Sequence, residues 1–477
     1  MCECDELRRE KSVSCLRVSL GLFLLSAAAL AHAGSPGECP GRPSYQPLRY
    51  DEDWSVLANS ACRTEMLDHI KYVPFSRDGW YLSMGGEIRQ RYENYQNPGF
   101  GSDPKDDNGY LLQRYLLHAD SHFGSRFRLF VQLQSGIENG RNGGPRLTDE
   151  DIIDLHQAFG DLILFKGAHS QLTLRVGRQE IEFGSGRLIG ASEGLNLRRA
   201  FDGGRVTYKL GRWTFNSTLL RPVLLKRDAF DDVPDHTQLE WGAGGLRPRA
   251  NNKGSVAFYY FGLDKKTAFF GPQRGRELRH TFGNRWWGSV GALDYDSEFI
   301  GQFGRFNGQD IVAGATSHEL GWNWREAPLK PRLGGKFDLV SGGSTPGTTL
   351  HTFNALFPNP VYAGRNALLG PANLSDAGPN VRLALGKKSN VTLDSPVYWR
   401  TSTHDGLYSF AGIPIRPGNR SNARYIGIQP GLQAEYRFSP HITANIAYSH
   451  FFVGRFFRET PPGKSVDYTV GSIAYKF

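Results

Sequence analysis

Between residues 80 and 477 the sequence repeats one unit, in which apolar and polar residues alternate until a group of turn residues follows. The same alternation occurs in 126–134, 332–339 and 442–452. Apolar residues at every second position fit a β-strand with two different faces and exclude a helical period. The clearest case is 425–438, where one face carries Ile426, Ile428, Leu432, Ala434, Tyr436 and Phe438 and the other carries Gln429, Gln433, Glu435 and Arg437.

The connections between these segments indicate how the strands are arranged. About eighteen candidate strands begin near residues 80, 110, 124, 152, 170, 202, 212, 239, 253, 275, 287, 310, 330, 379, 390, 424, 441 and 465, an even number as in bacterial barrels. Short connections alternate with long ones, which are 94–109, 137–151, 182–201, 342–378, 403–423 and 455–464. A soluble β-sandwich also has alternating strands but no reason to place its long loops at one end. The sequence therefore predicts an all-β protein, a transmembrane antiparallel up-and-down β-barrel.

The N-terminus has the features of a cleaved signal peptide, predicted over 1–33. A basic region precedes the apolar run 18–30, and Ala31, His32 and Ala33 form an A-x-A cleavage site. A membrane anchor is the alternative, but the run is short for a span. Residues 34–79 lack the strand pattern and are predicted to be a periplasmic segment before the barrel of 80–477. The mean hydropathy of −0.43 argues against helical spans further along.

Export has consequences for partners and for the cysteines. Ile473, Tyr475 and Phe477 alternate with Ser472, Ala474 and Lys476, and an aromatic ending of this kind is what the barrel assembly machinery reads. We expect a protein of the bacterial outer membrane that contacts lipid and lipopolysaccharide and meets no nucleic acid. Cys39 and Cys62 could form a disulfide in an oxidising periplasm, or remain two free thiols.

The polar faces of the strands carry more basic than acidic residues. Charges facing lipid are costly, so these side chains are expected to line the lumen, where guanidinium groups would attract anions such as carboxylates. The alternative is that the basic residues pair with lumen acids and brace the wall. The basic candidates are Arg89, Arg91, Arg114, Arg126, Arg128, Arg175, Arg205, Lys209, Arg212, Arg332, Lys336, Arg382, Arg400 and Arg437, and the acidic ones are Glu87, Glu93, Asp120, Asp338, Asp394 and Glu435.

Several motifs resemble the alginate-export family of outer-membrane proteins. They are Leu-Arg-Val-Gly-Arg-Gln-Glu-Ile at 174–181, Gly-Arg-Leu at 186–188, Asn-Leu-Arg-Arg at 196–199 and Phe-Asp-Gly at 201–203, with weaker matches at 50–54, 81–89 and 353–358. The resemblance implies a monomeric barrel with an electropositive constriction that passes alginate outward. The sequence departs from the founding exporters at 181–187, where they carry a tryptophan-rich stretch. The motif residues Gly177, Arg178, Gln179, Glu180, Asn196, Phe201, Asp202 and Gly203 are expected either to brace the loop 182–201 or to contact cargo; Asp202 could pair with an arginine such as Arg199.

The leading functional hypothesis is a passive channel for anionic saccharides or their polymers, without cofactor or metal. An anion-selective porin without polysaccharide specificity is the alternative, and an outer-membrane enzyme is a third class that no catalytic motif supports. An export role would also allow periplasmic export components as partners. The segment 342–378, rich in Gly, Pro and Thr, is expected to gate the pore or to fold inward as a constriction.

Overall fold

The computed structural model describes residues 39, 41–230, 233–248, 254–345 and 348–477, and the predicted signal peptide lies outside them. Residues Pro40–Phe477 form one compact unit. Within the described residues no helix is long and apolar enough to cross a membrane.

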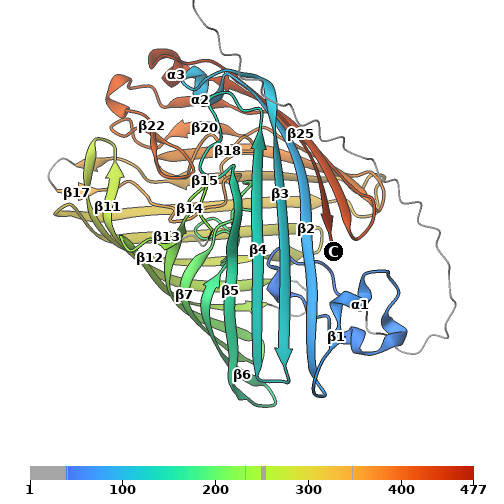
Figure 1. Ribbon diagram of the computed structural model, residues 1–477. Coiled ribbons are helices and arrows are strands. Elements are labelled where there is room, and N and C mark those ends of the chain that lie inside the picture. Colours follow the sequence, from blue (N-terminus) through green and yellow to red (C-terminus); the bar gives the residue numbers. More distant parts are fainter. Residues whose placement is uncertain (1–38, 40, 231–232, 249–253, 346–347) are drawn as a thin grey trace, which may run out of the picture. The chain divides into compact units, whose positions relative to one another are not determined.

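The unit is built on an 18-stranded, closed, antiparallel β-barrel (Figure 1). Each strand pairs with the next, and the last strand pairs with the first, so that Tyr92 faces Gly471 across the closing seam. The strands are β2 (Trp80–Gln96), β3 (Asp106–Phe123), β4 (Phe127–Asn139), β5 (Asp151–Lys166), β6 (Ser170–Gln179), β7 (Phe201–Leu210), β8 (Trp213–Leu224), β10 (Gln238–Pro248), β11 (Ser255–Phe270), β12 (Gln273–Val290), β13 (Leu293–Phe306), β14 (Gln309–Asn323), β15 (Arg332–Val340), β18 (Leu374–Ala384), β19 (Ser389–Asp394) with β20 (Val397–Arg400), β23 (Tyr425–Ile428) with β24 (Gly431–Arg437), β25 (Ile442–Val453) and β26 (Val466–Lys476).

Short elements lie outside this set. They are η1 (Arg49–Asp51), η2 (Ser55–Ala58), η3 (Ser60–Cys62), α1 (Asp68–Lys71), β1 (Val73–Pro74), α2 (Pro98–Gly101), β9 (Val233–Pro234), β16 (Ser344–Thr345), β17 (Thr349–Leu350), β21 (Leu407–Tyr408), β22 (Pro414–Arg416), η5 (Gly418–Arg420) and α3 (Arg455–Glu459).

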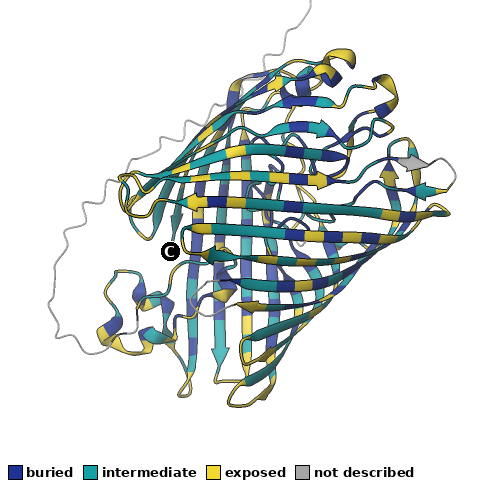
Figure 2. Ribbon diagram, turned by 180° about the vertical axis from the view of Figure 1, so that it is seen from behind, coloured by how far each residue is buried: buried dark blue, intermediate teal, exposed yellow. Residues whose placement is uncertain are grey.

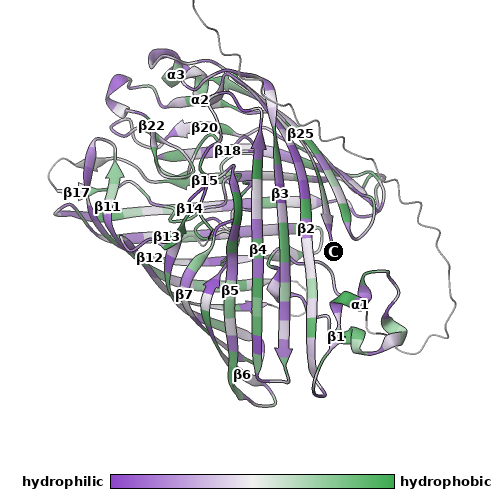
Figure 3. Cartoon of the chain, viewed as in Figure 1, coloured by the Kyte–Doolittle hydropathy of each residue, from purple (hydrophilic) through white to green (hydrophobic). Residues whose placement is uncertain are grey.

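The alternation of the sequence becomes the two faces of the wall. Phe337 and Ile446 are exposed on the outside, whereas Gln132, Asp338 and Ser449 are buried on the inside. Hydrophobic and hydrophilic bands alternate along β3 and β4 in Figure 3, and buried and exposed residues alternate along the strands in Figure 2. In lipid such strands satisfy their backbone groups only when the sheet closes on itself.

Ile426 was expected on the lipid face and is instead fully buried inside, in a core cluster with Phe451, Phe456 and Phe457. The cause is a register shift between Tyr398 and Trp399 where β20 pairs with β23. An extra residue in one strand moves the following side chains to the opposite face. The pattern from Leu432 onward follows the expectation, since Leu432 is exposed.

The two ends of the barrel differ as the sequence predicts, with two exceptions. One end, here called the long-loop end, carries the connections 97–105, 140–150, 180–200, 225–237, 341–373, 401–424 and 454–465, while the opposite short-turn end carries turns such as 124–126 and 211–212. The exceptions are 271–272 and 307–308, two-residue turns at the long-loop end. At these points β11 to β14 continue as long hairpins instead of ending in loops.

Candidate functional site

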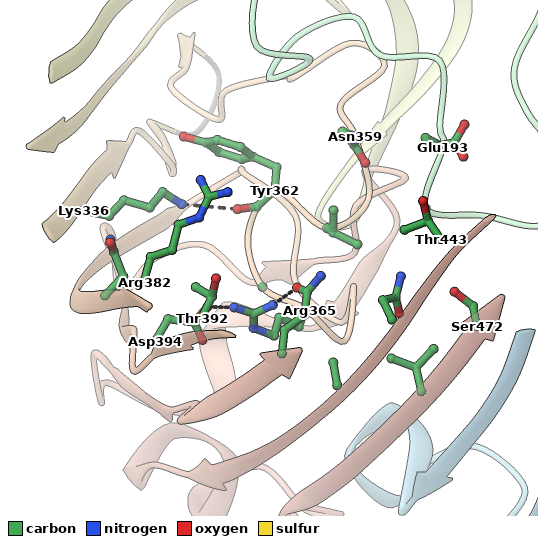
Figure 4. Close-up of a pocket in the computed structure, with 18 of the residues that line it drawn as sticks. Glu193, Lys336, Asn359, Tyr362, Arg365, Arg382, Thr392, Asp394, Thr443 and Ser472 are labelled. Carbon is green, nitrogen blue, oxygen red and sulfur yellow. Dashed lines mark hydrogen bonds and ion pairs between the residues drawn. The ribbon is translucent and has the colours of Figure 1, made fainter. Parts of the chain in front are cut away.

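A cavity with a volume of about 1430 Å³ lies inside the barrel. Its lining comes from the barrel wall, from two loops of the long-loop end and from the segment before β2. The lining includes Arg42, Tyr45, Glu87, Arg89, Arg91, Glu193, Gly194, Asp294, Asp296, Glu319, Arg332, Lys336, Asn359, Val361, Tyr362, Arg365, Asp376, Arg382, Asp394, Arg437, Tyr468 and Lys476. Figure 4 shows part of this lining around Lys336, Tyr362 and Arg365.

A second cavity, of about 70 Å³, lies beside the first and reaches toward the long loops 97–105 and 140–150. Five residues line both cavities: Arg91, Gly194, Val361, Arg365 and Tyr468. We call them the boundary ring. The boundary between the two cavities thus carries two guanidinium groups, those of Arg91 and Arg365.

The loop 180–200 contributes Gly194 to the ring because it folds into the barrel. Arg198 donates hydrogen bonds of 2.5 and 2.9 Å to the carboxylate of Glu180. Asn196 donates to the carbonyl of Asp149 at 2.7 Å, and Arg89 donates to the carbonyl of Leu195 at 2.6 Å. The loop is therefore held by an ion pair within it, by Asn196 bound to the loop 140–150, and by Arg89 of β2.

The second inward loop is 351–373, within the segment for which a gate or an inward fold was expected. Its Phe357 exchanges backbone hydrogen bonds with the first loop, accepting from Gly190 at 2.9 Å and donating to Leu188 at 2.8 Å. Phe357 also packs edge-to-face on Phe201. The two loops thus form one partition across the lumen.

Tyr362 fastens this partition to β14 and β15. Its hydroxyl donates to Asp338 at 2.7 Å, and its ring lies 4.3 Å from Nζ of Lys336. Burial raises the pKa of Tyr362, so the hydroxyl keeps its proton and remains a donor. Lys336 in turn forms ion pairs with Asp338 at 2.8 Å and Asp376 at 3.6 Å. Tyr362 and Arg365 were absent from the sequence-based candidates, because a loop has no periodicity that marks its inward side chains.

The cationic residues expected in the pore fall into three groups. The cavity lining contains Arg89, Arg91, Arg332, Lys336, Arg382 and Arg437. A second group is engaged in the wall or under the loops: Arg114 with Glu87 and Glu193, Arg128 with Asp120, Arg175 with Asp161, Arg205 with Asn216, and Arg400 with carbonyls of the loop 401–424. Arg126, Lys209 and Arg212 are exposed toward the short-turn end and do not belong to the described lining.

The acids of the cavity lining are bound by cations. Asp294 and Glu319 both contact Arg332, at 2.6 and 3.1 Å, and Asp394 contacts Arg365 at 2.5 Å. Glu87, Glu193, Asp296 and Asp376 likewise have cationic partners. The cavity is thus lined by many charges of both signs, rather than by arginine alone.

Arg382 and Arg437 differ from the other cations of the lining. Across the part of the chain that the structure describes, their side chains form neither an ion pair nor a hydrogen bond, and both are exposed to the cavity. Register explains Arg382, whose neighbours on the adjacent strands are Arg332 and Thr392 and not an acid.

The motif residues of β6 and of the region that follows it have structural contacts. Gly177 has φ of +131°, and a Cβ there would lie 2.2 Å from the carbonyl oxygen of Ala158. Arg178 donates to both oxygens of Asp202, at 2.7 and 3.0 Å. The arginine that pairs with Asp202 is therefore Arg178 and not Arg199, the example named from the sequence. Arg199 instead lies over the ring of Phe357. The other motif residues also contact the barrel wall or the inward loops. They are Gln179, Glu180, Asn196, Phe201 and Gly203.

The segment before β2 packs into the short-turn end. Tyr50 packs edge-to-face against Phe130 and Phe159, which stack on each other, and donates to the carbonyl of Glu180 at 2.9 Å. Arg49 donates to the carbonyls of Gly86 and Phe477 at 2.7 and 2.8 Å. Contact thus runs from this segment to the loop 180–200.

Cys39 and Cys62 are both disulfide-bonded.

Solved structures with a similar fold are outer-membrane porins of Pseudomonas aeruginosa. OccD3 (OpdP) matches with a TM-score of 0.57 at 14% identity over 83% of this chain and 91% of that chain. OccK3 (OpdO) matches with a TM-score of 0.56 at 12% identity over 83% and 95%, and OpdK, solved with vanillate, with 0.54 at 10% identity over 83% and 98%. No curated protein matches the sequence significantly.

The model of the family described as alginate export matches residues 80–471, which is almost the whole barrel. The segment before β2 precedes the matched region. Family and fold are both those of outer-membrane channels. The chain belongs to the alginate-export family of outer-membrane β-barrel proteins.

Proposed function

We propose that this channel passes anionic solutes, in particular acidic saccharides or their polymers, by passive diffusion. The observation that supports this proposal is the unequal pairing of charges in the cavity. Every acid of its described lining has a cationic partner, whereas Arg382 and Arg437 have none. The net field in the open part of the cavity is then positive, and anions concentrate there.

The positions of these residues suggest a path. In the strand register Arg382 lies opposite Thr392, and Thr392 lies opposite Gln433, so Arg382 lies level with Gln433. Arg437 lies about 13 Å further along β24, toward the short-turn end. Arg365 and Arg91 follow in the boundary ring. Guanidinium groups at intervals offer a carboxylate successive weak contacts, which suits transport because binding must also release.

Reversal potentials of the purified full-length protein in planar bilayers under a salt gradient test the proposal. We expect anion preference in the wild type and a shift toward no preference when Arg382→Gln and Arg437→Gln are combined. Lys209→Gln is the matched control, because it removes a cation outside the cavity lining. Cation preference of the wild type, or an unchanged ratio in the double variant, would contradict the proposal.

A second measurement separates the polymer channel from a general anion porin. Oligomers of an acidic polysaccharide such as alginate should block the current at concentrations at which a neutral glucan of equal length does not. Equal block by both polymers would favour the general porin.

A further inference from the structure

One sector of the internal cavity is lined by neutral side chains instead of ion pairs. It consists of Thr443 and Asn445 of β25 and of Ser472 and Ala474 of β26. All four residues are half-buried and belong to the cavity lining. Figure 4 shows Thr443 and Ser472 on these two neighbouring strands. We call the four residues the neutral panel.

The strand register makes the panel compact and flat. Thr443 lies opposite Ala474, and Asn445 lies opposite Ser472. Neighbouring strands are about 4.8 Å apart, and alternate residues of one strand are about 6.8 Å apart. The four Cα atoms therefore mark a rectangle about the size of one sugar ring, with a methyl group at one corner and hydrogen-bonding groups at the other three.

The polar groups of the panel are not used by the protein itself. Within the part of the chain that the structure describes, the side chains of Thr443, Asn445 and Ser472 form no hydrogen bond. A hydroxyl group both donates and accepts, and an amide side chain offers a donor and an acceptor. Elsewhere in the lining charged groups bind each other, as Asp294 and Arg332 do at 2.6 Å. The panel thus keeps its hydrogen-bonding groups for an occupant of the cavity.

Two guanidinium groups lie beside the panel. Arg437 of β24 lies opposite Thr443, and side chains in such positions have Cβ atoms about 5 Å apart. Arg91 of β2 lies opposite Ser472 on the other side. Arg91 is bound to Glu93 at 2.5 Å, whereas Arg437 has no partner among the described residues. Arg437 is therefore the cation that a ligand on the panel can bind.

The row of the sheet that contains Arg437 has no acid over these four strands. It runs from Arg437 through Thr443 and Ala474 to Arg89. Glu435 belongs to the next row and is absent from the described lining of the cavity. An anionic group beside Arg437 therefore meets a guanidinium without a carboxylate in the same row.

We propose that the neutral panel and Arg437 form a binding site for one carboxylated sugar residue. Arg437 binds the carboxylate through its planar donor fork. Thr443, Asn445 and Ser472 exchange hydrogen bonds with ring hydroxyls, and the C–H face of the ring packs on Ala474. The inference rests on the proposed function, because it names the ligand that one wall of the same cavity recognises. A site that binds hydroxyls discriminates against an analogue without them, since its polar groups then lose their partners.

The experiment compares two monocarboxylates with the same six-membered ring size. Galacturonate carries hydroxyls, and cyclohexanecarboxylate carries none. Each is added to the full-length protein in planar bilayers, and the half-blocking concentration of the potassium chloride current is measured. We expect the value for galacturonate to be about tenfold lower, the effect of a few hydrogen bonds of ordinary strength.

Variants assign this difference to the panel. Thr443→Val, Asn445→Leu and Ser472→Ala combined should raise the half-blocking concentration of galacturonate about tenfold, to that of cyclohexanecarboxylate. Ser472→Ala alone should act in the same direction. Thr214→Val, which removes a hydroxyl outside the cavity lining, is the matched control and should change neither value. Arg437→Gln should weaken block by both acids, because it removes the cation that both carboxylates bind.

The panel variants carry the same charges as the wild type, so their reversal potentials should be unchanged and show that the channel is folded. Equal block of the wild type by the two acids, or unchanged block by galacturonate in the triple variant, would overturn the binding site. Either result alongside a retained anion preference would leave the anion channel standing. Cation preference of the wild type would instead contradict the proposed function itself.

Discussion

The hydroxyl of Tyr362 donates a 2.7 Å hydrogen bond to Asp338, and this contact joins the inward loop 351–373 to β15. The same hydroxyl contacts Ser317 at 2.8 Å and accepts from Arg187 of the other inward loop at 3.0 Å. One side chain thus connects both halves of the partition to the wall. The stability of the partition is expected to depend on it.

Replacing Tyr362 with Phe should loosen the partition while the barrel remains folded. The buried Asp338 and Arg187 lose a shared partner, at a cost of about 1–3 kcal/mol. We expect more frequent transitions between current levels in single-channel recordings. Tyr436→Phe, at an exposed position of the lipid face, is the control, and the idea fails if both variants record like the wild type.

Replacing Arg175 with Gln should reduce stability and leave ion selectivity unchanged. Arg175 donates to both oxygens of Asp161, at 2.7 and 2.8 Å, and lies over the ring of Phe159. Its loss leaves the buried carboxylate of Asp161 with only the more distant Arg128, at 3.8 Å, which costs about 1–3 kcal/mol. We expect heat-induced unfolding, followed by electrophoretic mobility, at a clearly lower temperature. Arg382→Gln should instead change ion selectivity and leave stability unchanged. A changed reversal potential in Arg175→Gln would place its side chain on the ion path.

Replacing Gly177 with Ala should impair folding. The backbone has φ of +131°, and the new methyl group would meet the carbonyl oxygen of Ala158 at 2.2 Å, so that β5 and β6 must separate. We expect a strong loss of folded barrel after refolding in detergent. Gly301→Ala is the matched control, because a Cβ there meets no atom within 4 Å. Similar folding yields for the two variants would show that the close approach is not required.

The packing of the segment before β2 should depend on pH through Lys71. Burial, together with the charges of Arg49 and Arg42, lowers the pKa of Lys71 to about 7, although Glu52 and Asp68 act in the opposite direction. Its Nζ lies over the rings of Trp54 and Tyr45. Because the packed state disfavours the charged amine, its stability rises with pH between about 7 and the ordinary lysine value near 10.4, and is lowest below 7.

Hydrogen exchange of residues 41–72, compared between the wild type and Lys71→Met at each pH, measures this dependence. We expect protection of the wild type to increase relative to the variant as the pH rises from 7 to 10. His69→Gln, which removes an exposed imidazole of the same helix, should keep the wild-type behaviour. A constant difference between the wild type and Lys71→Met would exclude Lys71 as the titrating group.

Most of the barrel could be predicted from the sequence because its signal is local. The strands expected near 80, 170 and 441 begin at Trp80, Ser170 and Ile442. Alternation and turn residues define these boundaries within a few positions, without reference to distant parts of the chain. The alternation placed Ile426 on the wrong face. The register shift between Tyr398 and Trp399 that buries Ile426 does not appear in the sequence as a change of period.

The roles of the charged residues could not be predicted in this way. Arg175 and Arg382 occupy equivalent polar positions in their strands, but Arg175 faces Asp161 across the ladder, whereas Arg382 faces Arg332 and Thr392. The loops present the same difficulty, since Phe357 meets Leu188 and Tyr50 meets Glu180 over long sequence separations. The alternation alone determined that the chain forms strands with an apolar and a polar face. Only the tertiary structure decided which cations remain unpaired and what crosses the lumen, because both depend on strand register and on contacts between residues far apart in the sequence.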